Sequence, residues 1–183
     1  MRAFTLIEIV VVVAVYVIVM SSFIAYNSAS RAQIALSVEQ AKISQLILRA
    51  KSLTIASYSS PSSLRCGFGF SINYPARSYS LNRYDVLDNA DCDAIYYGEA
   101  GFENTIVVPL PLETYYLDPN LGFPGWGASD QFDEVLFIAP EPKTFLKVGG
   151  SLFRGTANIY LETRAAPIRS VTVSINSLGQ VSF

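Results

Sequence analysis

The feature that most constrains this 183-residue chain is an almost uninterrupted apolar run near its start. The run begins at Phe4, reaches Met20 and, after two serines, continues to Ala25. Roughly 20 apolar residues are enough to cross the hydrocarbon core of a bilayer as a helix. One ionisable side chain, Glu8, lies inside the run. A lone carboxylate at membrane depth is costly, so Glu8 is expected to have both a partner and a function.

Composition alone leaves several interpretations of the run open. A cleaved secretory signal would use Arg2 as its charged start and a small-residue exit near Ala29 and Ser30. Glu8 argues against that interpretation, because an acid early in the hydrophobic segment weakens such a signal. An ordinary single-span anchor would leave Glu8 unexplained. In either membrane-bound case, a basic Arg2 ahead of the span predicts a cytoplasmic N-terminus.

A third interpretation comes from a resemblance. The stretch Ala3-Phe4-Thr5-Leu6-Ile7-Glu8, followed at once by a long Val/Ile run, resembles the processing site of type IV prepilins and type II secretion pseudopilins. In that family a prepilin peptidase cuts before the Phe and methylates the new amino group. The resemblance implies cleavage between Ala3 and Phe4. It also implies that Glu8, fifth in the mature chain, meets the N-terminal amine of Phe4 on a neighbouring subunit during assembly.

The chain departs from the family pattern in ways that indicate its role. Ala3 stands where the family usually has Gly, and Val17 and Ala25 stand where major pilins tend to carry Gly and Pro within the membrane helix. These differences favour a minor pilin or pseudopilin over the bulk subunit.

The end of the chain carries a second resemblance. Residues Arg169–Val181 are similar to the closing hairpin of H-type minor pseudopilins and FimT-type minor pilins, in which a long N-terminal helix carries an all-β head. FimT-type proteins are associated with DNA capture through basic residues in a final Gly-Arg-Val-Arg. Here the sequence is Gly179-Gln180-Val181-Ser182, without either basic residue. DNA capture is therefore not transferred to this chain.

Apolar residues beyond the run continue at helical spacing. Wound at 3.6 residues per turn, one stripe contains Leu36, Ile43, Leu46, Ile47, Ala50 and Leu53. Polar residues are expected on other faces: Arg31, Gln33, Glu39, Gln40, Lys42 and Arg49. The pattern predicts one helix over residues 4–57, with a transmembrane part at 4–25 and an amphipathic second half, and about 80 Å long at 1.5 Å per residue.

The predicted fold is α+β: this helix carrying a mostly antiparallel β head. A leader at residues 1–3 precedes the helix, and a Ser/Pro-rich linker at 58–65 with Pro61 separates it from the head at 66–183. Alternation from Phe68 to Tyr74 and from Tyr79 to Leu81 predicts a first hairpin. Residues 85–141 read as loop-rich, with short strands at 95–97, 105–108 and 135–138. Strands at 157–162, 170–175 and 180–183 complete the head, the last two joined by a tight turn at 176–179.

The cysteines and acidic residues of the head give the remaining candidate sites. Cys66 and Cys92 predict one disulfide in an oxidising compartment, the alternative being two free buried thiols. Asp88, Asp91 and Asp93 are close enough in sequence to offer oxygens to one calcium ion, but their spacing does not match the EF-hand loop. The alternative is a turn held by Asp side chains beside Cys92. No resident cofactor is predicted.

Catalysis is not expected. The chain has no histidine, and no Ser-x-x-Lys arrangement or Gly-rich phosphate loop is present. A net charge of −2 gives no general basic field that would indicate nucleic acid.

The sequence therefore predicts a structural subunit, a minor pilin or pseudopilin of a type IV pilus or a type II secretion pseudopilus. It would be a single-pass inner-membrane protein with a periplasmic or extracellular head. Its expected partners are other pilin or pseudopilin subunits, prepilin peptidase, the inner-membrane assembly platform and membrane lipid. The alternative is a membrane-anchored surface-binding module, with DNA among its possible ligands.

Overall fold

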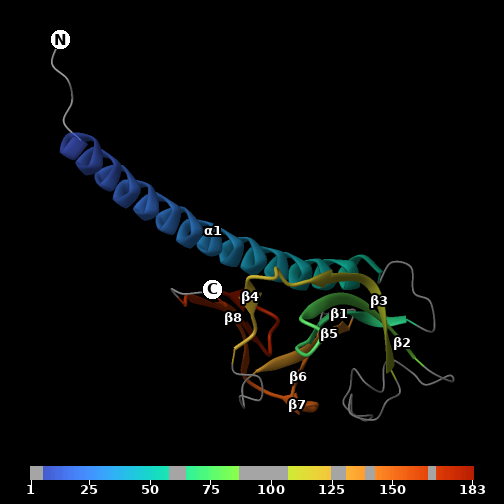
Figure 1. Ribbon diagram of the computed structural model, residues 1–183. Coiled ribbons are helices and arrows are strands. Elements are labelled where there is room, and N and C mark those ends of the chain that lie inside the picture. The colour runs from blue at the N-terminus through green and yellow to red at the C-terminus, as the bar shows by residue number, and fades with distance from the viewer. Residues whose placement is uncertain (1–5, 58–64, 87–106, 125–130, 139–142, 165–167) are drawn as a thin grey trace.

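The computed structural model describes residues 6–57, 65–86, 107–124, 131–138, 143–164 and 168–183. These residues form one helix, α1 (Leu6–Ser57), and ten strands in two antiparallel sheets. The second half of α1 lies along the β head, and its first half projects beyond the head (Figure 1). The predicted α+β architecture, an N-terminal apolar helix with a sheet-rich head, is present.

Helix α1 is continuous over 52 residues, about 78 Å at 1.5 Å per residue. No Gly or Pro interrupts it, and it ends at Ser57, four residues before Pro61. The prediction of one uninterrupted helix ending near residue 57 is confirmed over the described residues. The predicted leader and most of the predicted linker, residues 1–3 and 58–64, lie outside them.

The larger sheet has the order β3-β2-β1-β5-β6-β7. Its strands are β1 (Arg65–Asn73), β2 (Ser78–Val86), β3 (Val107–Tyr116), β5 (Phe132–Ile138), β6 (Lys143–Val148) and β7 (Ser151–Phe153). The β1–β2 hairpin occurs where the alternation of apolar residues predicts it, with Phe70 opposite Leu81. Because Arg65 opens β1, the head begins one residue before the predicted boundary.

The smaller sheet has the order β10-β9-β8-β4. It contains β4 (Leu121–Gly122), β8 (Thr156–Thr163), β9 (Ser170–Asn176) and β10 (Val181–Ser182). The turn between β9 and β10 is closed by a hydrogen bond from Gly179 N to Asn176 O at 2.8 Å, with Gly179 at a φ of 69°. A positive φ is accessible to glycine at little steric cost. The predicted C-terminal hairpin is confirmed.

One core joins the helix to both sheets. α1 contacts β1, β2 and β5 of the larger sheet and β8 and β9 of the smaller one. Leu36, Ile43 and Ala50, seven residues apart, are each at most 2% exposed on the helix face that meets the head. The sheets contribute Phe68, Phe70, Tyr79, Leu81, Val135, Phe137, Ile159, Leu161, Val173 and Ile175. The apolar stripe predicted for the second half of the helix is thus the face by which α1 is attached.

The prediction that residues 85–141 are loop-rich is wrong for β3, of which only Val107 and Val108 fall within the short strand predicted at 105–108. This strand has ten residues and contains Pro109 and Pro111, which the sequence reading placed in a loop. β3 lies at the edge of its sheet and pairs only with β2. A proline is tolerated in an edge strand, because the side without a neighbouring strand needs no backbone N–H donor. The strand predicted at 135–138 is present within β5, whereas the one predicted at 95–97 lies outside the described residues.

Strands β6 and β7 were not predicted. In β6 the lysines at 143 and 147 fall on one side of the strand, and Lys147 lies 3.4 Å from Glu134 on the neighbouring β5. This pair joins a basic and an acidic segment that the sequence keeps apart.

Candidate interaction surfaces of the helix

The first half of α1 is apolar around its whole circumference. Leu6–Phe23 has a mean hydropathy of 2.6, and none of its residues is buried within the chain. Leu6 is 81% exposed and Val12 67% exposed. By length and composition this segment could cross a membrane, and a signal sequence would satisfy the same test. Either way, its surface requires an apolar environment that the head does not supply.

Glu8 lies in the first turn of α1, on this exposed apolar segment. A carboxylate is favoured in the first turn of a helix, because the unpaired N–H groups there carry partial positive charge. Ala3 and Phe4, the predicted processing residues, lie outside the described residues. The predicted contact between Glu8 and a neighbouring Phe4 therefore stays a prediction.

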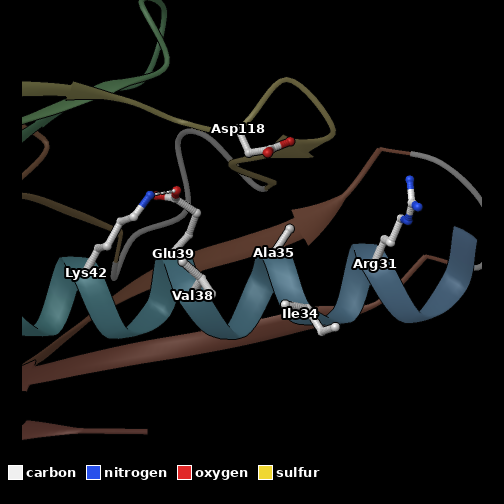
Figure 2. Close-up of a pocket in the computed structure, with 7 residues that line it drawn as sticks. All are labelled: Arg31, Ile34, Ala35, Val38, Glu39, Lys42 and Asp118. Atoms are coloured by element: carbon white, nitrogen blue, oxygen red, sulfur yellow. Dashed lines mark hydrogen bonds and ion pairs between the residues drawn. The ribbon is translucent and has the colours of Figure 1, made fainter. Parts of the chain in front are cut away.

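A surface hollow lies beside α1 where the helix meets the head (Figure 2). Its lining combines apolar and charged side chains: Arg31, Ile34, Ala35, Val38, Glu39, Lys42 and Asp118. Six of these residues come from α1, and Asp118 comes from the connection between β3 and β4. Figure 2 shows Glu39 and Lys42 joined by an ion pair on the wall of this hollow.

Glu39 is the one acidic residue of the second half of α1, and it is 4% exposed. One carboxylate oxygen lies 2.6 Å from the Lys42 ammonium, and the other accepts a hydrogen bond from the Tyr79 hydroxyl at 2.6 Å. Burial, and then the hydrogen bond to Glu39, raise the pKa of Tyr79 well above its usual value. Tyr79 therefore remains a donor, and this contact joins α1 to β2.

The prediction that Glu39 lies on a different face from the apolar stripe is wrong. Glu39 follows Leu36 by three residues and precedes Ile43 by four, so it lies on the same stripe as those buried residues. The spacing of Glu39 from Leu36 and Ile43 predicts a buried position, but a charged side chain is not counted in a stripe defined by apolar residues. A buried carboxylate is tolerated here because both oxygens have partners.

The loop that carries Asp118 is held by Arg77. This residue adopts a φ of 52° in the β1–β2 turn, and its guanidinium donates to the carbonyl oxygens of Asp118 at 2.9 Å, Pro119 at 3.3 Å and Leu121. Three carbonyls satisfied by one side chain fix the path of the chain from β3 into β4. Arg77 was not anticipated from the sequence, because its partners are about 40 residues away along the chain.

The other predicted sites of the head are only partly described. Cys66, in β1, is 5% exposed, and Cys92 lies outside the described residues, so the pairing stays a prediction. The calcium candidates Asp88, Asp91 and Asp93 lie outside them as well. Within the described part of the chain, no group of three His, Cys, Asp or Glu side chains is placed to hold a metal ion.

A row of polar side chains crosses the face of the larger sheet that is turned away from the core. In cross-strand order it contains Thr114, Ser80, Ser71, Glu134 and Lys147. Ser71 and Ser80 are 3.1 Å apart, Asn82 donates to Ser71 at 2.8 Å, and the Tyr84 hydroxyl donates to Glu134. Because these groups satisfy one another, the row works as a hydrogen-bonded support for the sheet.

Comparisons of this chain with family models, curated proteins and solved structures give no match.

Proposed function

We propose that this chain is a structural subunit of a helical fibre, a minor pilin or pseudopilin of a type IV pilus or a type II secretion pseudopilus. The observation that carries the proposal is the division of α1. One half exposes apolar side chains on every side, and the other half is packed into a β head. A subunit that is anchored in a membrane and later packed into a helical bundle needs this division.

The attachment of α1 to the head supports the same proposal. The core residues of α1 pack on both sheets, and the Glu39–Tyr79 hydrogen bond adds a polar contact near the point where the helix leaves the head. A helix held in this way can transmit a displacement of its N-terminal half to the head as a rigid unit. A secretory signal would instead be removed near Ser30, and the apolar half of α1 would then be absent from the mature protein.

In the proposed life cycle the chain is first an inner-membrane protein with its N-terminus in the cytoplasm. Prepilin peptidase removes residues 1–3 and methylates Phe4. The assembly platform then draws the subunit from the lipid into the fibre, with the apolar half of α1 inside and the head outside. Glu8 finds the amine of Phe4 on an adjacent subunit, an attraction that strengthens in low dielectric, where an unpaired carboxylate is costly.

The experiment that tests this proposal is the intact mass and N-terminal sequence of the protein extracted from membranes. The expected result is a chain beginning at Phe4 with one added methyl group on its amine. A protein that still begins at Met1, or a soluble species cut near Ser30, would contradict the proposal. A strain that lacks prepilin peptidase supplies the control, since there the leader should remain.

A further inference from the structure

The outward face of the second half of α1 carries a mainly apolar stripe that the head leaves exposed. Its positions alternate by four and three residues: Ile34, Val38, Ala41, Gln45, Leu48, Ser52 and Ile55. All seven are exposed, and the large apolar members Ile34, Val38, Leu48 and Ile55 have exposed fractions between 46% and 62%. We call these seven residues the outer stripe.

The outer stripe lies on the side of α1 opposite the head. In a seven-residue repeat its members occupy the a and d positions, and the buried residues Leu36, Ile43 and Ala50 all occupy f. The f position points away from the a/d seam, so the two apolar faces serve different partners. A 3.5-residue spacing of apolar side chains is the pattern by which one helix packs along another.

The surface around the outer stripe has the relief that helix packing needs. Ile34 and Val38 form a ridge with a hollow on each side (Figure 2 shows one of them). The second hollow is lined by Ser30, Gln33, Ser37 and Ala41 together with the ridge. A third, further along, is lined by Lys42, Gln45, Leu46, Arg49 and Tyr115. Ridges of side chains on one helix pack into such grooves on another.

The charges that α1 itself carries beside the outer stripe are mainly basic, while from the head Asp118 lines one of the hollows and Glu113 pairs with Arg49. Beyond residue 30, α1 carries the cations Arg31, Lys42, Arg49 and Lys51 and a single acid, Glu39, which is buried against the head. Lys42 and Arg49 are bonded to Glu39 and Glu113, yet their side chains keep 49% and 52% exposure. Lys51 donates to the Gly179 carbonyl oxygen of the head at 3.4 Å, so a second copy laid on this face would bring its own Arg31, Lys42 and Arg49 against these. Like charges on the two helices disfavour pairing with a second copy, whereas acidic residues on the partner helix favour pairing with a different protein.

We propose that the outer stripe binds an apolar helix of a different subunit, one that carries acidic residues beside its contact face. This rests on the proposed function in one respect: the partner is taken to be another subunit of the same fibre. Ile34, Val38, Leu48 and Ile55 supply the buried contact, and Arg31, Lys42 and Arg49 select the partner by charge. This chain is then a heteromeric joint and is not the repeating unit of its own fibre.

The test places the photo-cross-linking residue p-benzoylphenylalanine at Val38 or Leu48 of the full-length protein in cells that make the fibre. The matched control carries it at Leu152, which is 40% exposed on β7 and lies across the head from α1 (Figure 1). The expected result is an adduct from Val38 and Leu48 but not from Leu152. Peptide mapping should place the other end on an apolar helical segment of another protein with Asp or Glu beside it.

Charge variants check the selection. In the Leu48 cross-linking background, Arg49→Glu should reduce the adduct several-fold, whereas Arg49→Lys should leave it. Three results would each overturn the inference. The first is an adduct at twice the mass of this chain, the second is a cross-linked segment without acidic neighbours, and the third is labelling no stronger than at Leu152. The mass of the same preparation separates this from the proposed function. If Phe4 is methylated but the outer stripe gives no adduct, the proposed helix contact is wrong and the proposed processing stands. If the outer stripe gives an adduct but the chain still begins at Met1, the proposed processing is wrong and the helix contact stands.

Discussion

The buried carboxylate of Glu39 accepts a hydrogen bond from the hydroxyl of Tyr79 at 2.6 Å, joining the long helix to the second strand of the head. The ammonium of Lys42 lies 2.6 Å from the other oxygen of the same carboxylate, so both carboxylate oxygens have a partner. The polar contact lies within a mainly apolar junction, next to Leu36 and Ile43, which are at most 2% exposed. The stability of the junction therefore depends on all three groups being present together.

Replacing Glu39 by Ala should destabilise the protein by about 1–3 kcal/mol, because the buried Tyr79 hydroxyl then loses its acceptor. Tyr79→Phe should cost less, since Lys42 still pairs with Glu39 in that variant. Glu39→Gln keeps an acceptor for Tyr79 but loses the ion pair, and is expected between the two. Chemical unfolding of the full chain in detergent, followed by circular dichroism, measures the order. Equal stability of Glu39→Ala and the wild type would show that the contact contributes nothing.

Three buried tyrosines predict a loss of stability at high pH. Burial raises the pKa of Tyr74, Tyr79 and Tyr84 above the usual value, with additional contributions from Asp133, Glu39 and Glu134 respectively. The hydroxyls stay protonated in the folded chain above pH 10 but ionise in the unfolded chain. The unfolded state then binds fewer protons, so the contribution of these tyrosines to the free energy of unfolding is constant below about pH 10 and falls above it, by up to ~1.4 kcal/mol per pH unit for each tyrosine.

Unfolding measured between pH 8 and about pH 11 checks this prediction. The Tyr79→Phe variant should lose stability less steeply with pH than the wild type, because one fewer phenol distinguishes the two states. If the absorbance showed that all tyrosines ionise at alkaline pH while the protein stayed folded, the buried phenols would be accessible to solvent. The prediction would then be wrong.

The glycines of β1 predict a contrast in the response to alanine. A Cβ at Gly69 would meet the carbonyl oxygen of Val135 and, at 2.8 Å, the ring of Tyr84, whereas a Cβ at Gly122 would meet only Arg164 at 3.6 Å. Gly69→Ala should therefore destabilise the head by at least about 1–3 kcal/mol, because backbone atoms must move. Gly122→Ala is the control and should be nearly neutral. A neutral Gly69→Ala, measured by the same unfolding assay, would contradict the close packing of β1 against β5.

The sequence predicted what depends on periodicity and failed where partners are distant. Leu36, Ile43 and Ala50 repeat at helical spacing, and the alternation in β8 and β9 is equally regular, so these elements were found. The strand predicted at 105–108 overlaps only the start of β3, and the rest of β3 was missed because Pro109 and Pro111 argue against a central strand. Only the sheet order shows that β3 is an edge strand. The role of Arg77 depends on loop carbonyls far along the chain, which no local pattern reveals.

A disulfide between Cys66 and Cys92 predicts that the protein isolated without reductant has a mass two hydrogens lower than the reduced protein. Cys66 is 5% exposed at the start of β1, so a bond there would tie the connection between β2 and β3 to the sheet. In the chain-entropy model, closing a loop of roughly 25 residues stabilises a protein by about 3 kcal/mol. Cys92→Ser should lower the unfolding midpoint by a corresponding amount, whereas adding reductant to that variant should change nothing further. Equal masses with and without reductant would show that the disulfide does not form.

Glu8 provides the sharpest test of assembly, because it is the one charged side chain between Leu6 and Phe23. Glu8→Leu should insert into the membrane at least as well as the wild type, since it removes a costly charge from an apolar segment. The same variant should enter fibres several-fold less, because a neighbouring amine at Phe4 then has no carboxylate to meet. Glu8→Asp is the matched control, keeping the charge on a shorter side chain, and should retain part of the incorporation. Quantifying the subunit in sheared fibres relative to membranes measures this ratio. Normal incorporation of Glu8→Leu would show that fibre entry depends on the apolar surface of α1 alone.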